Sequence, residues 1–198
     1  MKIIKTVDLG TRLVYSDRLV ESIKSLFDID ILGFDFDKNY DNVFYESNII
    51  FRTSCTSKKN IGNNEKNGYF FLLGSIFDVY SKENVSNVDI LNIKDIRDVK
   101  FFFKKYGGKN IGMEFLLSDM RYFFGDKIGK WFSDMKWIHE QCIKYDFQFI
   151  LSSGASNYSE LLSSKVFNAF LTKINIETKK YWNDLNCWLN DKKSLYWQ

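Results

Sequence analysis

The chain has 198 residues, of which 45% are hydrophobic and 27% are charged, and its formal net charge at pH 7 is +3. This length and composition favour one folded domain spanning residues 1–198 and argue against global disorder. The three cysteines are widely spaced and form no CxxC pair, so neither a zinc knuckle nor a disulfide framework is supported. No segment reaches the roughly 18 uncharged apolar residues of a membrane span. We therefore expect a soluble protein of the reducing cytoplasm that contacts no membrane.

Short apolar runs alternate with amphipathic segments of helix length, a pattern typical of parallel βα units. The predicted strands are residues 3–8, 31–36, 48–52, 69–73, 88–93, 111–116 and 147–151. The predicted helices are residues 17–27 with Ser16 as N-cap, 75–80, 96–105, 127–145, 159–173 and 177–193, and the polar residues 53–68 are predicted to form a loop. Seven parallel strands form either an open doubly wound sheet or a small closed barrel, and periodicity does not distinguish the two.

Two of the predicted helices carry aromatic residues whose expected roles differ. The apolar face of residues 177–193 consists of Trp182, Leu185, Trp188 and Leu189. We expect this amphipathic C-terminal helix to pack on the sheet, in preference to binding a partner protein. Trp137 lies off the apolar stripe of residues 127–145, which is typical of a partner surface or of a ring covered by a loop. His139, the only histidine in the sequence, lies in the same segment and is expected to be at the surface or packed.

Polar residues stand at the predicted ends of several strands, where the functional face of a parallel sheet lies. They are Asp8, Asp35, Asp37, Arg52, Asp89, Glu114, Ser152 and Ser153. Converging carboxylates are able to hold a divalent metal that activates water for phosphoester hydrolysis. The alternative is that these acids are solvated or bonded to nearby amides. A single histidine in the whole chain weighs against a histidine-rich hydrolase.

The corner formed by Ser152, Ser153, Gly154 and Ala155 joins a predicted strand to a helix. A serine nucleophile requires a base, and His139 lies on a covering helix, so a catalytic triad is not expected. Small residues at such a corner allow backbone N–H groups to approach an anion. Contact with phosphate and a plain strand-to-helix turn both remain open for this corner.

A basic face is predicted on the helix at residues 96–105. Arg97, Lys100 and Lys104 follow the spacing i, i+3, i+7, and Lys105 and Lys109 extend the positive charge. No acidic residue occurs between Asp98 and Glu114. Such a face is able to neutralise RNA phosphates, although many charged helix faces are simply solvated.

Three segments carry a resemblance to a known family. Residues 87–93 read NVDILNI, residues 112–120 read GMEFLLSDM, and residues 150–170 read ILSSGASNYSELLSSKVFNAF. In this order they resemble two strands and the strand–corner–helix segment of ribonuclease P protein component 3, the thirty-kilodalton subunit family shared by archaea and eukaryotes. The resemblance extends over about residues 6–174.

This resemblance implies a single TIM-like α/β barrel of about seven parallel strands with surrounding helices, related to the polymerase-and-histidinol-phosphatase phosphoesterases. It also implies a non-catalytic subunit of ribonuclease P, in which the RNA, with magnesium, removes the 5′ leader from precursor tRNA. The implied partners are the ribonuclease P RNA, the component 2 protein, other protein subunits, and precursor tRNA through the holoenzyme. No catalytic residue, metal site or cofactor is expected in the chain itself.

The chain departs from the family just after the Ser-Ser-Gly-Ala corner. The family has Arg-Ser-Pro-Arg there, whereas this chain has Leu162-Ser163-Ser164-Lys165, so that Lys165 keeps a positive charge at the matching position. The candidate RNA contacts are Arg52, Arg97, Lys100, Lys104, Lys105, Ser152, Ser153 and Lys165. The alternative function, a metal-dependent phosphoesterase, would use Asp8, Asp35, Asp89 and Glu114.

Overall fold

The computed structural model describes residues 4–35, 48–54, 70–75, 88–93 and 96–196, and for some of these, including Arg97, it describes the backbone only. In this part of the chain, seven strands form one parallel sheet in which each strand pairs with the next in sequence. The strands are β1 (Val7–Thr11), β2 (Ile31–Asp35), β3 (Ile49–Ser54), β4 (Phe70–Ser75), β5 (Ile90–Asn92), β6 (Gly112–Leu116) and β7 (Gln148–Ser152). The predicted parallel α/β fold is confirmed.

The sheet is strongly curled. Arg52 on β3 and Glu114 on β6 are three strands apart, which corresponds to roughly 14 Å in a flat sheet. Their side chains nevertheless form a hydrogen bond of 2.8 Å across the interior. The terminal strands β1 and β7 also meet, where the Arg12 N–H donates to the Ala155 carbonyl at 2.8 Å. Among the described residues this seam has no backbone ladder like those that join the other strands.

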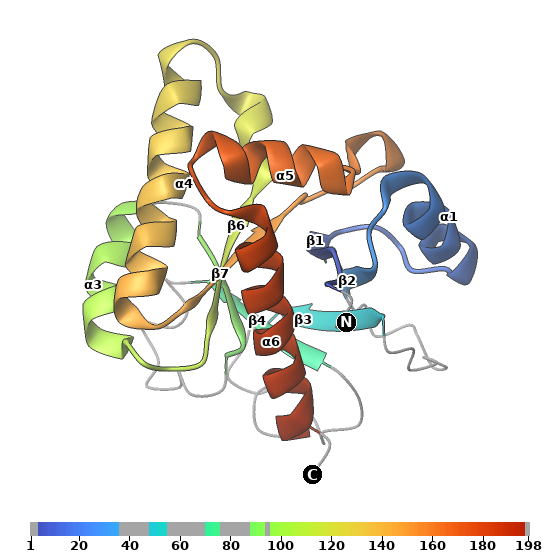
Figure 1. The fold of residues 1–198 in the computed structure, drawn as a ribbon, viewed down its shortest axis with the longest axis horizontal. Coiled ribbons are helices and arrows are strands. Elements are labelled where there is room, and N and C mark those ends of the chain that lie inside the picture. The colour runs from blue at the N-terminus through green and yellow to red at the C-terminus, as the bar shows by residue number, and fades with distance from the viewer. Residues whose placement is uncertain (1–3, 36–47, 55–69, 76–87, 94–95, 197–198) are drawn as a thin grey trace.

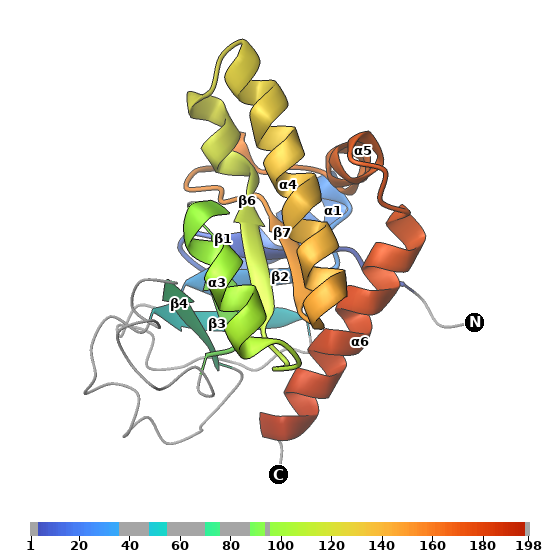
Figure 2. The ribbon, with the colours of Figure 1, turned by 90° about the vertical axis from the view of Figure 1, so that its left-hand side faces the viewer.

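Helices cover the outside of this curled sheet (Figure 1). They are α1 (Asp17–Phe27), α3 (Ile96–Tyr106), α4 (Asp126–Tyr145), α5 (Ser164–Lys173) and α6 (Thr178–Tyr196), with short 3-10 turns η2 (Leu117–Tyr122) and η3 (Tyr158–Glu160). Ser16 caps α1 as predicted, because its hydroxyl accepts a hydrogen bond from the Leu19 N–H at 3.3 Å. Helices α3 and α4 pack on each other beside β6 and β7 (Figures 1 and 2). No described helix combines the length and apolarity needed to cross a membrane.

Two elements start at least four residues later than predicted, for local reasons. Strand β1 begins at Val7 instead of residue 3, and the preceding Thr6 N–H donates to the Asp30 carboxylate at 2.7 Å. The helix predicted at residues 159–173 is divided into η3 and α5 by Leu161, which is extended and buried. Residues 76–80 of the predicted helix 75–80 and residues 55–68 of the predicted loop lie outside the described residues.

Helix α6 covers the end of the sheet at which the strands begin. Its Asn186 amide donates to the carbonyl of Lys5, just before β1, at 2.6 Å. Trp188 packs against Gly112 at the start of β6, and Lys192 pairs with Asp89, just before β5, at 2.9 Å. Trp182, Leu185, Trp188 and Leu189 are all buried. The prediction that this helix packs on the sheet is therefore confirmed.

Candidate functional site

The interior of the sheet contains a guanidinium between two carboxylates. Nη1 of Arg52 donates to both oxygens of Glu114, at 2.8 and 3.0 Å. Its Nη2 and Nε donate to Oδ1 of Asp35, at 2.5 and 3.1 Å. The side chains of Arg52 and Glu114 are 3% and 0% exposed, whereas that of Asp35 is 40% exposed. The ion pair is therefore buried, and Asp35 marks its open side at the carboxyl ends of the strands.

Both carboxylates hold Arg52 in its charged form. Burial alone would lower the pKa of Arg52, but the charges of Glu114 and Asp35 outweigh it and raise that pKa. Glu114 also accepts a hydrogen bond from the Ser152 hydroxyl at 2.7 Å and a long one from the Asn92 amide at 3.4 Å. These neutral donors help to satisfy the charge on Glu114, as a carboxylate in a dry interior requires.

Asp8 forms a second acidic position beside this ion pair, at the β1–β7 seam. Its Oδ1 accepts hydrogen bonds from the backbone N–H groups of Ser153, at 3.0 Å, and Gly10, at 3.3 Å. Burial raises the pKa of Asp8 despite these bonds, and the neighbouring charge of Glu114 raises it further. Asp8 therefore joins two strands that share no backbone ladder among the described residues.

Gly10 is necessary for this arrangement. A Cβ atom at position 10 would lie 2.5 Å from the Cβ of Ser152 and 2.8 Å from Oε1 of Glu114. Any side chain there would displace the Glu114 carboxylate or separate β1 from β7. The sequence prediction overlooked Gly10, although a glycine two residues after a buried aspartate in a strand is a sign of close packing.

The Ser-Ser-Gly-Ala corner is part of the same interior. Ser152 and Ser153 are fully buried, and the Ser152 hydroxyl is bonded to Glu114. The backbone amides of the corner are also used: Ser153 N–H donates to Asp8, and Ala155 N–H donates to the Ser153 hydroxyl. Gly154 has φ +68° and leaves no room for a side chain beside Ser118. The corner is therefore a packed strand-to-helix turn, and the phosphate-contact hypothesis is not supported for its buried groups.

Asp89 does not belong to the cluster of carboxylates. The sequence prediction put it at the end of a strand with Asp35 and Glu114, but it precedes β5 and lies at the opposite end of the sheet. There its carboxylate accepts a hydrogen bond from Lys192 at 2.9 Å, and both residues are buried. The prediction was wrong because the apolar run at residues 88–93 contains three strand residues, with Asp89 before them.

The remaining carboxylates are poorly arranged to hold a metal ion. Within the described residues, no group of three or more histidine, cysteine, aspartate or glutamate side chains has the geometry of a metal site. The guanidinium of Arg52 lies where a cation bridging Asp35 and Glu114 would have to lie. Asp37 lies outside the described residues. The interior thus has a fixed organic cation in place of an open metal position.

The candidate RNA contacts divide into buried and exposed residues. Arg52, Ser152 and Ser153 are buried and form hydrogen bonds within the protein, so we no longer propose that they contact RNA directly. Lys104, Lys105 and Lys165 are exposed, and Lys100 is exposed with its ammonium 5.7 Å from the ring centre of Trp137. The Arg97 side chain lies outside the described part of the structure.

Trp137, on α4, packs against helix α3. Its ring meets Phe103 of α3 edge to face, with 6.1 Å between the ring centres. The half-buried ring is covered by α3 and by Lys100, so neither the partner surface nor the covering loop that the sequence suggested is needed to explain it.

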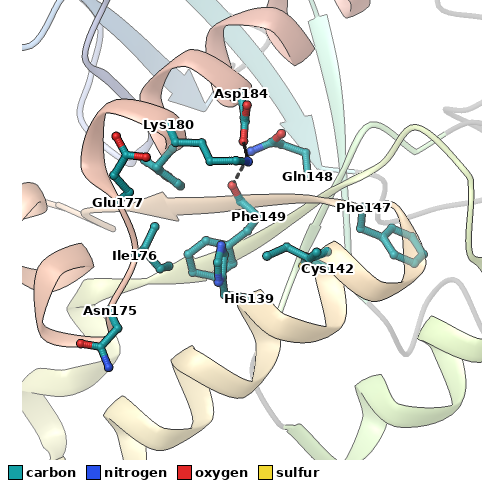
Figure 3. Close-up of a pocket in the computed structure, with 12 residues that line it drawn as sticks. His139, Cys142, Phe147, Gln148, Phe149, Asn175, Ile176, Glu177, Lys180 and Asp184 are labelled. Carbon is teal, nitrogen blue, oxygen red and sulfur yellow. Dashed lines mark hydrogen bonds and ion pairs between the residues drawn. The ribbon is translucent and has the colours of Figure 1, made fainter.

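A small pocket of about 180 Å³ lies outside the sheet, between α4 and α6 (Figure 3). His139 is half-buried there against Phe149, with 5.4 Å between the ring centres, as the packing role predicted for it requires. Burial and the nearby charge of Lys180 lower the pKa of His139, against the opposing effect of Glu140. Burial also raises the pKa of the Cys142 thiol well above its ordinary value. Both shifts favour the uncharged forms of the imidazole and the thiol.

Comparisons with known proteins give a likeness of fold. No family model matches the chain, and no curated protein matches it in sequence. A chain of the solved structure described as "cryo-EM structure of archaeal Ribonuclease P with mature tRNA" superposes with a TM-score of 0.69 at 13% sequence identity. The superposition covers 96% of this chain and 92% of that chain. The two folds therefore agree over nearly their whole length.

Proposed function

We propose that this chain is a non-catalytic protein subunit of ribonuclease P that supports RNA-catalysed removal of the 5′ leader from precursor tRNA. The observation that carries the proposal is the likeness of fold to a chain of an archaeal ribonuclease P complex, over 96% of this chain. The resemblance of residues 87–93, 112–120 and 150–170 to the component 3 family supports it independently, because it rests on sequence order and not on the fold.

The proposal also includes more specific assignments of family, fold and partners. They are membership of the component 3 family, a TIM-like barrel related to the polymerase-and-histidinol-phosphatase phosphoesterases, and partnership with the ribonuclease P RNA, the component 2 protein and other subunits. The bond between β3 and β6 and the contact between β1 and β7 support the barrel. We propose that the chain functions in the cytoplasm. Precursor tRNA would be bound through the holoenzyme. The magnesium would be bound by the RNA.

The buried ion pair supports a scaffolding role for this chain. A metal-dependent phosphoesterase needs carboxylates that open toward a cation and a substrate. Glu114 is instead fully buried and bonded to Arg52, Ser152 and Asn92. That alternative function predicts divalent-metal binding and phosphatase activity in the purified chain, whereas the proposed function predicts neither.

Reconstituted cleavage of precursor tRNA tests the proposal. The cognate RNA and the other protein subunits are assembled with and without this chain, and the cleavage rate is measured over a magnesium titration. We expect omission of the chain to slow cleavage or to raise the magnesium concentration required. An unchanged rate and an unchanged magnesium requirement would rule out the proposed function.

A further inference from the structure

The carboxyl-terminal ends of α3 and α4 meet beside the ends at which β6 and β7 begin. The N–H of Gly108, two residues after α3, donates to the carbonyl of Tyr145, the last residue of α4, at 2.9 Å. Both views show the two helices side by side (Figures 1 and 2). We give the name lysine surface to six exposed residues of α3, of the segment just after it and of the last turn of α4: Lys100, Phe101, Lys104, Lys105, Lys109 and Lys144.

Among the described side chains, the lysine surface has five lysines and only two exposed acids close to them in sequence, Glu140 and Asp146. None of its five lysines forms an ion pair with another described residue, whereas Lys180 is paired with Asp184 and Lys192 with Asp89. The sequence contains no acidic residue between Asp98 and Glu114, and Asp146 follows Lys144 at the end of α4. The surface is therefore a concentration of positive charge available to a partner.

Aromatic rings hold several of these ammonium groups in place. The ring centre of Tyr106 lies 5.0 Å from Nζ of Lys105 and 5.7 Å from Nζ of Lys109. Nζ of Lys144 lies 5.3 Å from the ring centre of Tyr145. These are cation–π distances, so the lysines are partly ordered before any partner binds. Tyr106 and Tyr145 are only partly exposed, and each ring lies next to at least one ammonium group.

Phe101 is different, because its side chain is 77% exposed. It lies three and four residues before Lys104 and Lys105, so all three side chains share one face of α3. An open aromatic ring beside lysines is the combination with which proteins bind unpaired nucleotides: the ring stacks on a base while the ammonium groups contact phosphates. An acidic protein would also be attracted by the charge, but it has no equivalent need for an open ring among lysines.

Helix stabilisation explains only part of this surface. Cations near helix C-termini interact favourably with the helix dipole, and Lys104, Lys105 and Lys144 fit that role. Lys109 lies beyond α3 and Lys100 lies in its middle, so the dipole does not explain their positions. It also does not explain the exposure of Phe101.

We infer that the lysine surface binds RNA, with phosphate groups on the lysines and an unpaired base stacked on the ring of Phe101. This inference rests on the proposed function, and it names the part of the chain that meets the RNA. That part lies at the end of the sheet where β6 and β7 begin, opposite the carboxyl end that holds Arg52 and Glu114.

The charge component is tested by salt dependence of binding. The purified full chain is titrated against a short, unstructured, fluorescein-labelled oligouridine at several salt concentrations. Replacing Lys104, Lys105, Lys109 and Lys144 together by Gln should reduce the slope of log K against log salt by about 3, since each phosphate contact on a single strand contributes about 0.7. The matched control replaces four exposed lysines elsewhere by Gln, namely Lys127, Lys130, Lys173 and Lys179, and should leave most of the slope in place.

The stacking component is tested by Phe101→Ala. Loss of one stacked base weakens binding of oligouridine by roughly 5- to 150-fold. Binding of a fully paired RNA duplex should change by less than about twofold, since a duplex offers no unpaired base. The matched control is Leu26→Ala, because Leu26 is similarly exposed, at 76%, on α1. Circular dichroism of each variant checks that the fold is intact.

Any of the following results would overturn the inference. The first is a salt slope that the control set reduces as much as the lysine-surface set. The second is an unchanged affinity of Phe101→Ala for oligouridine. The third is binding of polyglutamate as tight as that of oligouridine at equal ionic strength. If the chain binds no RNA but still supports precursor-tRNA cleavage, the inference fails and the proposed function stands. If the chain binds RNA through this surface but has no effect on cleavage, the proposed function fails and the RNA-binding surface stands.

Discussion

Arg52 and Glu114 are buried charges that depend on each other. Removing one partner of a buried pair leaves the other charge without compensation in a medium of low dielectric, which costs more than the pair itself contributes. Arg52 retains Asp35, but that carboxylate is 40% exposed and contacts the other side of the guanidinium. Loss of the Glu114 charge should therefore reduce the stability of the fold more than loss of the Asp35 charge.

The first prediction concerns Glu114→Gln, which keeps the shape of the side chain and removes its charge. We expect the free energy of unfolding, measured by urea denaturation, to fall by about 3 kcal/mol. The control is Asp184→Asn, which breaks the exposed pair with Lys180 and should cost less than about 0.5 kcal/mol. Equal losses in the two variants would show that burial of the Arg52–Glu114 pair has no special effect on stability.

The second prediction concerns the pH dependence that Asp8 imposes. Below its ordinary pKa of 3.8, Asp8 is protonated in both the folded and the unfolded chain. As the pH rises, the unfolded chain loses the proton first, because burial raises the pKa of Asp8 in the folded chain. The folded state then binds more protons, so the free energy of unfolding falls as the pH rises from 3.8 through the raised pKa.

Asp8→Asn should remove that decline. Urea denaturation of the wild type and the variant over the acidic and neutral range measures the difference between their stability curves. The control is Asp126→Asn, a change at an exposed residue in the first turn of α4. If Asp8→Asn and the wild type lose stability in parallel as the pH rises, Asp8 does not have the titration behaviour that its burial implies.

At the scale of elements, helix α6 supplies a hydrogen-bond partner at the seam where β1 and β7 share no backbone ladder among the described residues. The N–H of Leu151, on the free side of β7, donates to the hydroxyl of Tyr181 at 2.8 Å. Two residues farther along the chain, the Ser153 N–H donates to the carboxylate of Asp8 on β1. Side chains from α6 and β1 thus take the place of a backbone ladder at the β1–β7 seam. This use of a helix residue as a strand partner has no local sequence signal.

The third prediction follows from that hydrogen bond. Tyr181→Phe leaves the Leu151 N–H buried without a partner, which should reduce the free energy of unfolding by about 1–3 kcal/mol. Amide hydrogen exchange should accelerate at Leu151 more than at other residues of β7. The control is Tyr158→Phe, since Tyr158 is 64% exposed. Unchanged exchange at Leu151 would show that the Tyr181 hydroxyl does not protect this edge.

Predictions from sequence succeeded for elements whose signal is local. The apolar stripe of α4 places Trp131, Met135, Ile138 and Cys142 on one buried face, and the helix was predicted to within one residue. The start of α5 was missed because Ser159, a residue type common at helix starts, was interpreted as the start signal. Ser159 lies instead in η3, where its hydroxyl donates to the side chain of Asn157 at 2.6 Å. The sequence alone does not show that the extended Leu161 follows this turn.

At the scale of the whole molecule, the interior site depends on curvature, which sequence periodicity does not report. Asp35, Arg52 and Glu114 were predicted near one end of the sheet, and that much is confirmed. That Arg52 binds Glu114, three strands away, follows only from the curl of the sheet. Asp89 and Lys192, which are far apart in the sequence, pair at the other end because α6 returns across it. The basic face of the helix at residues 96–105 was easier to predict, since it depends only on the spacing of the lysines along one helix.

The position of α6 in the sequence also affects how the protein is made. All seven strands are translated before Tyr181, yet this residue supplies the partner of the Leu151 amide at the β1–β7 seam. A chain that has formed β7 but not yet α6 therefore carries an unprotected strand edge at this seam.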